Sequence, residues 1–248
     1  RSFSDMRDYT FRAALDVLGN QYINVRGSFD HTARIGAGFS EASIEEGGSQ
    51  PGLRFYDEAD RDRNRGALIV TLTPMSIFDI SFQVTKGRDV YKGEGHDFGL
   101  LNNDNQSINL GASVSPMETV TLGASYGKEK FTAFQKSSNS NPPGTDYGSW
   151  TDPNRVWNLD NDENVNNFLA YMDLVKAIPN TEIRFSYDYS DSDQAFIHSG
   201  PRITALATNA ILTAGDTRPC AAGLTSCFEA LPNVTNTWHR FTTNFRYH

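Results

Sequence analysis

Three acidic residues, Asp160, Asp162 and Glu163, are the strongest candidates for metal ligands in the sequence. Carboxylates at alternate positions of a turn can converge on a hard cation such as Ca²⁺. The segment lacks the glycine and the ligand spacing of an EF-hand loop, so a solvated acidic loop is the simpler interpretation. No two of the five histidines have the spacing of metal ligands. We therefore expect no metal site beyond this one candidate.

The two cysteines, Cys220 and Cys227, lie in a turn-rich segment and could close a short disulfide in an oxidising compartment. Their spacing is not that of a Cys-x-x-Cys redox or metal motif. The sequence also contains no Cys-x-x-Cys-His motif, so we expect this chain to attach no c-type haem covalently and to bind no cofactor of its own.

Motifs for catalysis and for nucleic-acid binding are absent from the sequence. It has no Gly-x-Ser-x-Gly elbow, phosphate-binding loop or zinc-protease motif. With a net charge of −8, it also lacks the basic clusters that neutralise phosphates in nucleic-acid complexes. No apolar run approaches the 18 or so residues of a membrane helix. We expect neither an enzyme nor a nucleic-acid binder, so the function must lie in the elements themselves.

The dominant pattern is an alternation of apolar and polar residues in segments of about ten residues, which is typical of strands with two different faces. The pattern favours an all-β, antiparallel meander of about nine strands. Six segments alternate clearly and three more are strands by composition: 9–17, 23–35, 80–84, 108–114, 122–126 and 183–189, then 66–73, 164–176 and 236–248.

The connections alternate between short and long. Short turns lie near 19–21, 75–78, 116–119 and 177–180, and long polar segments near 36–64, 88–105, 132–163 and 191–235. Short turns at one end of the strands and long loops at the other are typical of a transmembrane β-barrel, whose long loops are extracellular. A secreted β-sandwich with an adhesive role is an alternative class. Detergent dependence would separate the two.

If the strands form a barrel, the alternation assigns side chains to its two surfaces. We expect the charged parity to face the lumen: Arg12, Asp16, Arg26, Asp30, Arg34, Arg184 and Asp188. We expect the apolar parity to face lipid: Phe11, Leu15, Phe29, Phe82, Leu110, Leu122, Phe185 and Tyr187.

Nine strands are an odd number, whereas bacterial single-chain barrels have even numbers. We therefore expect residues 1–248 to be a single transmembrane segment of a larger barrel, incomplete at both ends and folded as an open, curled meander.

Several segments resemble the decahaem-associated outer-membrane β-barrel family of the MtrB/PioB type. The resemblance is carried by FYDEADRDRNR at 55–65, ASYGKEKFTAFQ at 124–135, WTDPNRVWNLDNDENV at 150–165, IRFSYDYS at 183–190 and NTWHRFTTNFRY at 236–247. These are strand and loop sequences without a catalytic signature, and they cover most of the chain from about residue 50 onward.

The resemblance implies a large porin-like barrel in the bacterial outer membrane that sheathes a multihaem c-type cytochrome. Such a porin-cytochrome conduit carries electrons across the membrane for extracellular electron transfer, with haem only on the partner cytochrome. The alternative within the same fold is a diffusion porin or a substrate-specific outer-membrane transporter. The contents of the lumen would distinguish these functions.

Overall fold

The computed structural model describes residues 5–20, 22–37, 52–93, 97–138, 156–175, 178–200, 203–205, 210–211 and 231–248. The regular structure in these ranges is β-strand. Within the same ranges, no helix is long and apolar enough to span a membrane.

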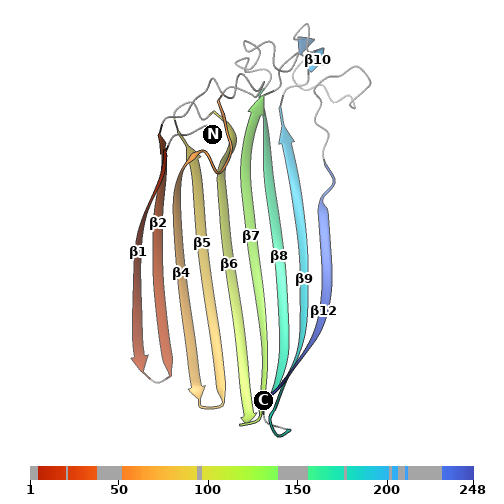
Figure 1. Ribbon diagram of the computed structural model, residues 1–248. Coiled ribbons are helices and arrows are strands. Elements are labelled where there is room, and N and C mark those ends of the chain that lie inside the picture. The colour runs from red at the N-terminus through yellow and green to blue at the C-terminus, as the bar shows by residue number, and fades with distance from the viewer. Residues whose placement is uncertain are drawn as a thin grey trace.

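Nine long strands form one antiparallel meander in which each pairs with the next long strand along the chain (Figure 1). β1 and β12 lie at the two edges of this open sheet. The prediction of an all-β antiparallel meander is confirmed. The strands are β1 (Asp5–Asn20), β2 (Ile23–Ala37), β4 (Asp60–Met75), β5 (Phe78–Lys92), β6 (Phe98–Met117), β7 (Val120–Ser138), β8 (Val156–Val175), β9 (Thr181–Ser199) and β12 (Val234–Tyr247).

Three short strands complete the described structure. β3 (Leu53–Arg54) pairs in parallel with the start of β6, and β10 (Ile203–Ala205) pairs with β11 (Ala210–Ile211) in a separate ribbon. β3 adds to the edge of β6 just beyond the residues that pair with β5.

The long strands extend into all four segments where long loops were expected, 36–64, 88–105, 132–163 and 191–235. The connection expected over 88–105, for example, is confined to residues 93–97, between the end of β5 and the start of β6. The physical reason is that both faces of these strand ends carry polar residues, so hydropathy does not alternate there although the backbone ladder continues.

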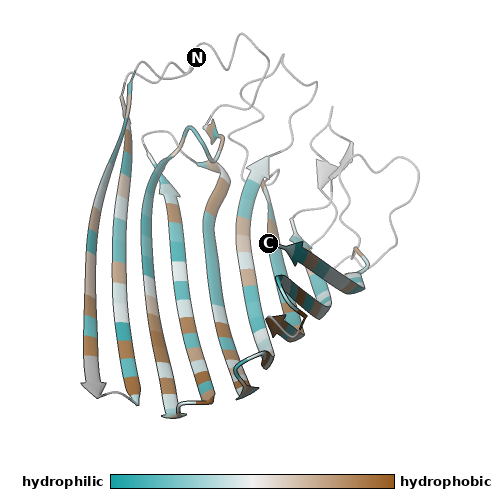
Figure 2. Cartoon of the chain, turned by 60° about the horizontal axis from the view of Figure 1, so that its bottom comes forward, coloured by the Kyte–Doolittle hydropathy of each residue, from teal (hydrophilic) through white to brown (hydrophobic). Residues whose placement is uncertain are grey.

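The register divides the long strands between two faces. One face, which we call the banded face, carries all eight side chains that were expected to face lipid. The opposite face, which we call the polar face, carries all seven that were expected to face the lumen. Apolar residues concentrate in the parts of the central strands next to the short turns (Figure 2).

The apolar band on the banded face crosses the sheet diagonally. In β1 the band reaches Tyr9, near the end of the strand away from the short turns. When the paired residues are followed from strand to strand, Tyr9 lies in the same row as Ile197 of β9. In β9, however, the continuous band ends at Tyr189, eight residues nearer the short turns, because Asp191 and Asp193 follow. Over the seven strand-to-strand steps from β1 to β9, the shift is about one residue per strand. This stagger corresponds to a strand tilt of about 35°, which is typical of barrels.

The two faces predict that the same substitution will destabilise the protein to different extents at neighbouring positions of β6. Leu110, which is 52% exposed on the banded face, lies within the apolar band, whereas Asn109 lies on the polar face. We expect Leu110→Arg to destabilise the inserted protein by about 2–4 kcal/mol, because a guanidinium would enter hydrocarbon. Asn109→Arg should cost much less. Urea titration of the full-length protein in lipid vesicles measures both, and equal losses would contradict the face assignment.

Candidate functional site: the polar face of the sheet

Ion pairs join directly opposite residues across the polar face. The seven residues predicted from the sequence take part in five of these pairs. In the first hairpin, guanidinium–carboxylate distances are 2.8 Å for Arg12–Asp30, 3.5 Å for Arg26–Asp16 and 3.0 Å for Arg34–Asp8. At the other side of the sheet they are 2.8 Å for Arg184–Asp173, 3.2 Å for Arg240–Asp188 and 3.5 Å for Arg246–Glu182. Cross-strand pairing therefore neutralises much of the charge on this wall.

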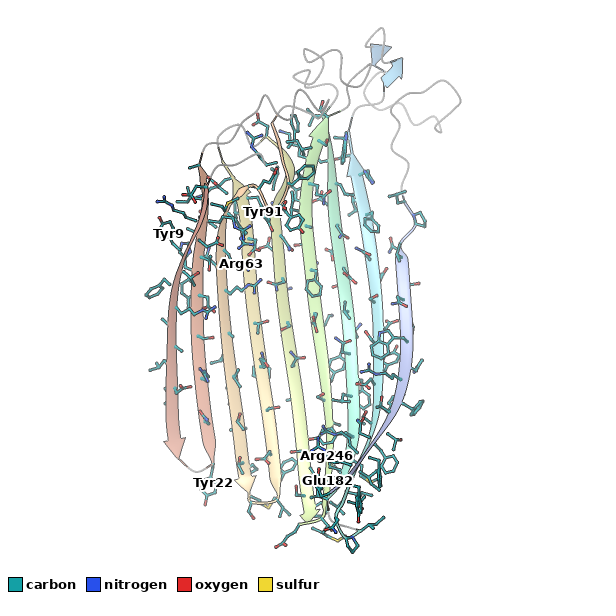
Figure 3. The ribbon with its side chains drawn as sticks, viewed as in Figure 1. Tyr9, Tyr22, Arg63, Tyr91, Glu182 and Arg246 are labelled. Atoms are coloured by element: carbon teal, nitrogen blue, oxygen red, sulfur yellow. The ribbon has the colours of Figure 1, made fainter. Side chains whose placement is uncertain are left out.

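The most buried of these pairs joins Arg63 of β4 to Asp89 of β5. Arg63 Nε donates to Asp89 Oδ1 at 2.9 Å, and its Nη2 donates to Oδ2 at 2.7 Å. This bidentate geometry is the strongest form of a guanidinium–carboxylate contact. Asp89 is only 6% exposed, and the buried Tyr91 follows it on the same face. Figure 3 shows Arg63 and Tyr91 near the end of the sheet away from the short turns.

The segment 52–59 folds against this end of the sheet. The N–H groups of Asp97 and Phe98 donate to the carbonyl of Gly52, and those of Glu58 and Ala59 donate to the carbonyl of Phe55. Arg34 Nη1 reaches the carbonyl of Asp57 at 3.5 Å. The segment thus connects β2, β4 and β6 where β5 ends.

Sequence reasoning missed the Arg63–Asp89 pair, because both residues lie in segments that were expected to be loops. A signal was present in the alternation of Arg61, Arg63 and Arg65, which has the period of a strand. These arginines alternate with polar residues and not with apolar ones, so hydropathy alone did not indicate a strand.

At several points on the polar face, a glycine leaves space that a neighbouring side chain occupies. The ring of Tyr171 lies over Gly123, and the side chains of Asn105 and Asn109 lie over Gly87 and Gly127. A Cβ at any of these glycines would overlap the neighbouring side chain. The neighbours therefore lie flat along the sheet instead of projecting from it.

Hollows on the polar face lie between β8, β9 and β12. The larger, of about 550 Å³, is lined by Asp173, Glu182, Arg184, Asn244 and Arg246, among others. Next to it, a hollow of about 420 Å³ has Arg184 and Arg240 in its wall, and the Arg184 guanidinium lies 4.6 Å from the centre of the Tyr171 ring. Figure 3 places Glu182 and Arg246 close to the short turns. This end of the wall offers guanidinium donors to an anionic group.

The acidic candidates for cation binding do not converge. Asp160, Asp162 and Glu163 lie in β8, not in a loop, so Glu163 points to the opposite face from the other two. Asp162 is paired with Lys130 at 2.7 Å. No group of three potential ligands is found among the described residues. Cys220 and Cys227 lie outside the described residues.

Comparison with known proteins bears on both fold and family. The model of the outer membrane beta-barrel porin family MtrB/PioB matches residues 3–248. The sequence matches no curated protein.

Two solved structures from Escherichia coli are similar in fold. The ferric-catecholate import receptor Fiu, in its closed form, has a TM-score of 0.55 at 8% identity, over 98% of this chain and 41% of the receptor. The outer membrane transporter YddB has a TM-score of 0.49 at 9% identity, over 77% of this chain and 26% of the transporter. The chain thus spans well under half the length of either protein. The likeness to Fiu supports the outer-membrane barrel fold.

The buried Arg63–Asp89 pair should contribute more to stability than the exposed pairs. Asp89→Ala would leave the Arg63 guanidinium part-buried and unpaired, which we expect to cost about 1–3 kcal/mol. Asp30→Ala is the matched control, because its partner Arg12 is 80% exposed and such pairs contribute less than about 1 kcal/mol. Urea titration in detergent micelles compares the two. Equal losses would show that burial of the pair has no energetic consequence.

Proposed function

The chain belongs to the outer membrane β-barrel porin family MtrB/PioB. We propose that it forms part of the wall of a barrel that sheathes a multihaem c-type cytochrome. In this role the banded face meets lipid and the polar face meets the cytochrome. The protein holds and insulates the electron carrier without a catalytic residue of its own. The outcome is a conduit for extracellular electron transfer.

The observation that carries this proposal is the length of the wall relative to its apolar band. β6 and β8 have 20 residues each, and β7 and β9 have 19. Twenty residues extend about 65 Å, or about 50 Å along the barrel axis at the tilt given above. A transmembrane barrel needs only about 25 Å of apolar surface. Strands this long suit an elongated partner that passes through the membrane and projects beyond it.

The polar face also suits a protein partner. Its charges are largely paired within the wall, so a docked surface would meet hydrogen-bonding groups without a strong field of one sign. The side chains that lie over Gly87, Gly123 and Gly127 allow close approach. The guanidinium groups of Arg184 and Arg240 are placed to donate to carboxylates such as haem propionates.

Covalent haem provides the decisive test, because this sequence has no Cys-x-x-Cys-His motif. We expect full-length protein purified from outer membranes in mild detergent to carry a stoichiometric multihaem polypeptide. Haem staining after denaturing electrophoresis would detect it as a separate band. A haem-free barrel that conducts ions in planar bilayers would overturn the proposal in favour of a diffusion porin or transporter.

The arginines beside the polar-face hollows should contribute to retention of the cytochrome. We expect glutamine at Arg184, Arg240 and Arg246 to lower the haem retained per barrel several-fold after a wash at high ionic strength. The substitutions remove the donors, leave Asp173 and Asp188 without these ion-pair partners and leave Glu182 with His248 alone, and the carboxylates would repel propionates.

Arg88→Gln on the banded face is the control and should retain haem as the wild type does, with folding of all variants checked by heat-modifiable migration. If the triple variant retains as much haem as the wild type, these arginines do not contribute to the contact with the cytochrome.

A further inference from the structure

Four basic side chains gather on the banded face just beyond the apolar band. Lys86 and Arg88 lie on β5, and Lys128 and Lys130 lie on β7. Lys86 is level with Lys130 through Gln106 of β6, which separates them by about 10 Å. We call these four residues the basic patch.

The basic patch retains positive charge although the whole chain has a net charge of −8. Lys86 and Lys128 are exposed and form no ion pair within the part of the chain that the structure describes. Arg88 lies 3.7 Å from Asp104, and Lys130 lies 2.7 Å from Asp162. Two of the four cations are therefore available to an anionic ligand.

The height of the patch matches the boundary of the hydrocarbon. Lys86 is the next residue on the banded face after Val84, and Lys128 is the next after Tyr126, where the band ends in β5 and β7. Ammonium groups at this level lie where lipid headgroups begin. The patch is on the side of the band away from the short turns, which is the extracellular side of an outer-membrane barrel.

A shallow groove of about 370 Å³ lies between the members of the patch. Lys86, Arg88 and Lys130 line it together with Asn105, Gln106 and Thr132, whose amide and hydroxyl groups can also donate hydrogen bonds. Asp104, the ion-pair partner of Arg88, lines it as well. Three cations against one carboxylate, with neutral donors beside them, leave the groove with an excess of positive charge that is suited to a phosphate.

The patch is confined to β5–β7. On β9, the first residue of the banded face beyond the band is Asp191, which accepts a hydrogen bond from Thr237 at 2.7 Å. Asp193 follows and accepts one from Asn233 at 3.1 Å. Because these acidic residues lie only two strands from β7, the positive charge marks one lipid position and not a continuous ring of lipids.

We propose that the basic patch binds the phosphate groups of a lipopolysaccharide molecule in the outer leaflet. This site lies on the opposite face from the proposed cytochrome contact, so the two proposals stand or fall separately.

Binding of lipid A to delipidated, full-length protein in detergent tests the site. The probes are diphosphoryl lipid A and its dephosphorylated form, and native mass spectrometry measures the occupancy. We expect the triple variant Lys86→Gln, Lys128→Gln and Lys130→Gln to bind diphosphoryl lipid A at least tenfold more weakly than the wild type. Arginine at the same three positions should preserve the affinity, because charge is retained.

A matched control removes three cations from other parts of the banded face through Arg7→Gln, Lys92→Gln and Lys136→Gln. Arg7 lies just beyond the band in β1, at the far edge of the sheet, and Lys92 and Lys136 lie farther from the band than the patch does. We expect this variant to bind as the wild type does. An equal loss in both triple variants would reduce the effect to general electrostatic attraction and overturn the site. Wild-type affinity in the patch variant, or equally tight binding of dephosphorylated lipid A, would overturn it as well.

Discussion

The antiparallel backbone ladder is the constraint on which the rest of this structure depends. A chain in hydrocarbon has no water to satisfy its N–H and C=O groups, so each strand must pair along its length. The ladder is indifferent to side chains and runs through glycines that a soluble strand would avoid, among them Gly87, Gly111 and Gly123. At all three positions the absence of a side chain is used, because Asn105, Ser81 and Tyr171 occupy the space.

Register converts the ladder into two surfaces with different chemistry. A shift of one residue would move each charged residue of the polar face onto the banded face, and the apolar residues in the opposite direction. Ion pairs such as Arg12–Asp30 and Arg184–Asp173 join directly opposite residues, so they favour the same register as the apolar band. Two independent signals thus select one alignment of the strands.

The sequence predicted the part of the fold where the two signals alternate strictly. Phe82 and Leu110 belong to segments with one apolar parity, so both strand and face could be predicted from hydropathy. Arg63 and Asp89 could not be placed in the same way, because their strand ends are polar on both faces. Their pairing depends on the ladder that aligns β4 with β5. The candidate cation site was likewise predicted from a segment that hydropathy does not identify as a strand. Asp162 and Glu163 belong to β8, so they lie on opposite faces.

Strand tilt determines what each charge on the banded face can contact. Lys86 and Asp193 lie in the same row of the ladder. The band, however, ends at Val84 in β5, two residues before Lys86, and at Tyr189 in β9, four residues before Asp193. From β5 to β9 a row of paired residues therefore moves two residues farther from the band, so Lys86 lies at the edge of the band and Asp193 lies farther from it. The row of a residue in the ladder and its depth relative to the membrane are therefore different quantities, and the strand tilt relates them. The same substitution can thus act on lipid contact in one strand and on solvation alone in another.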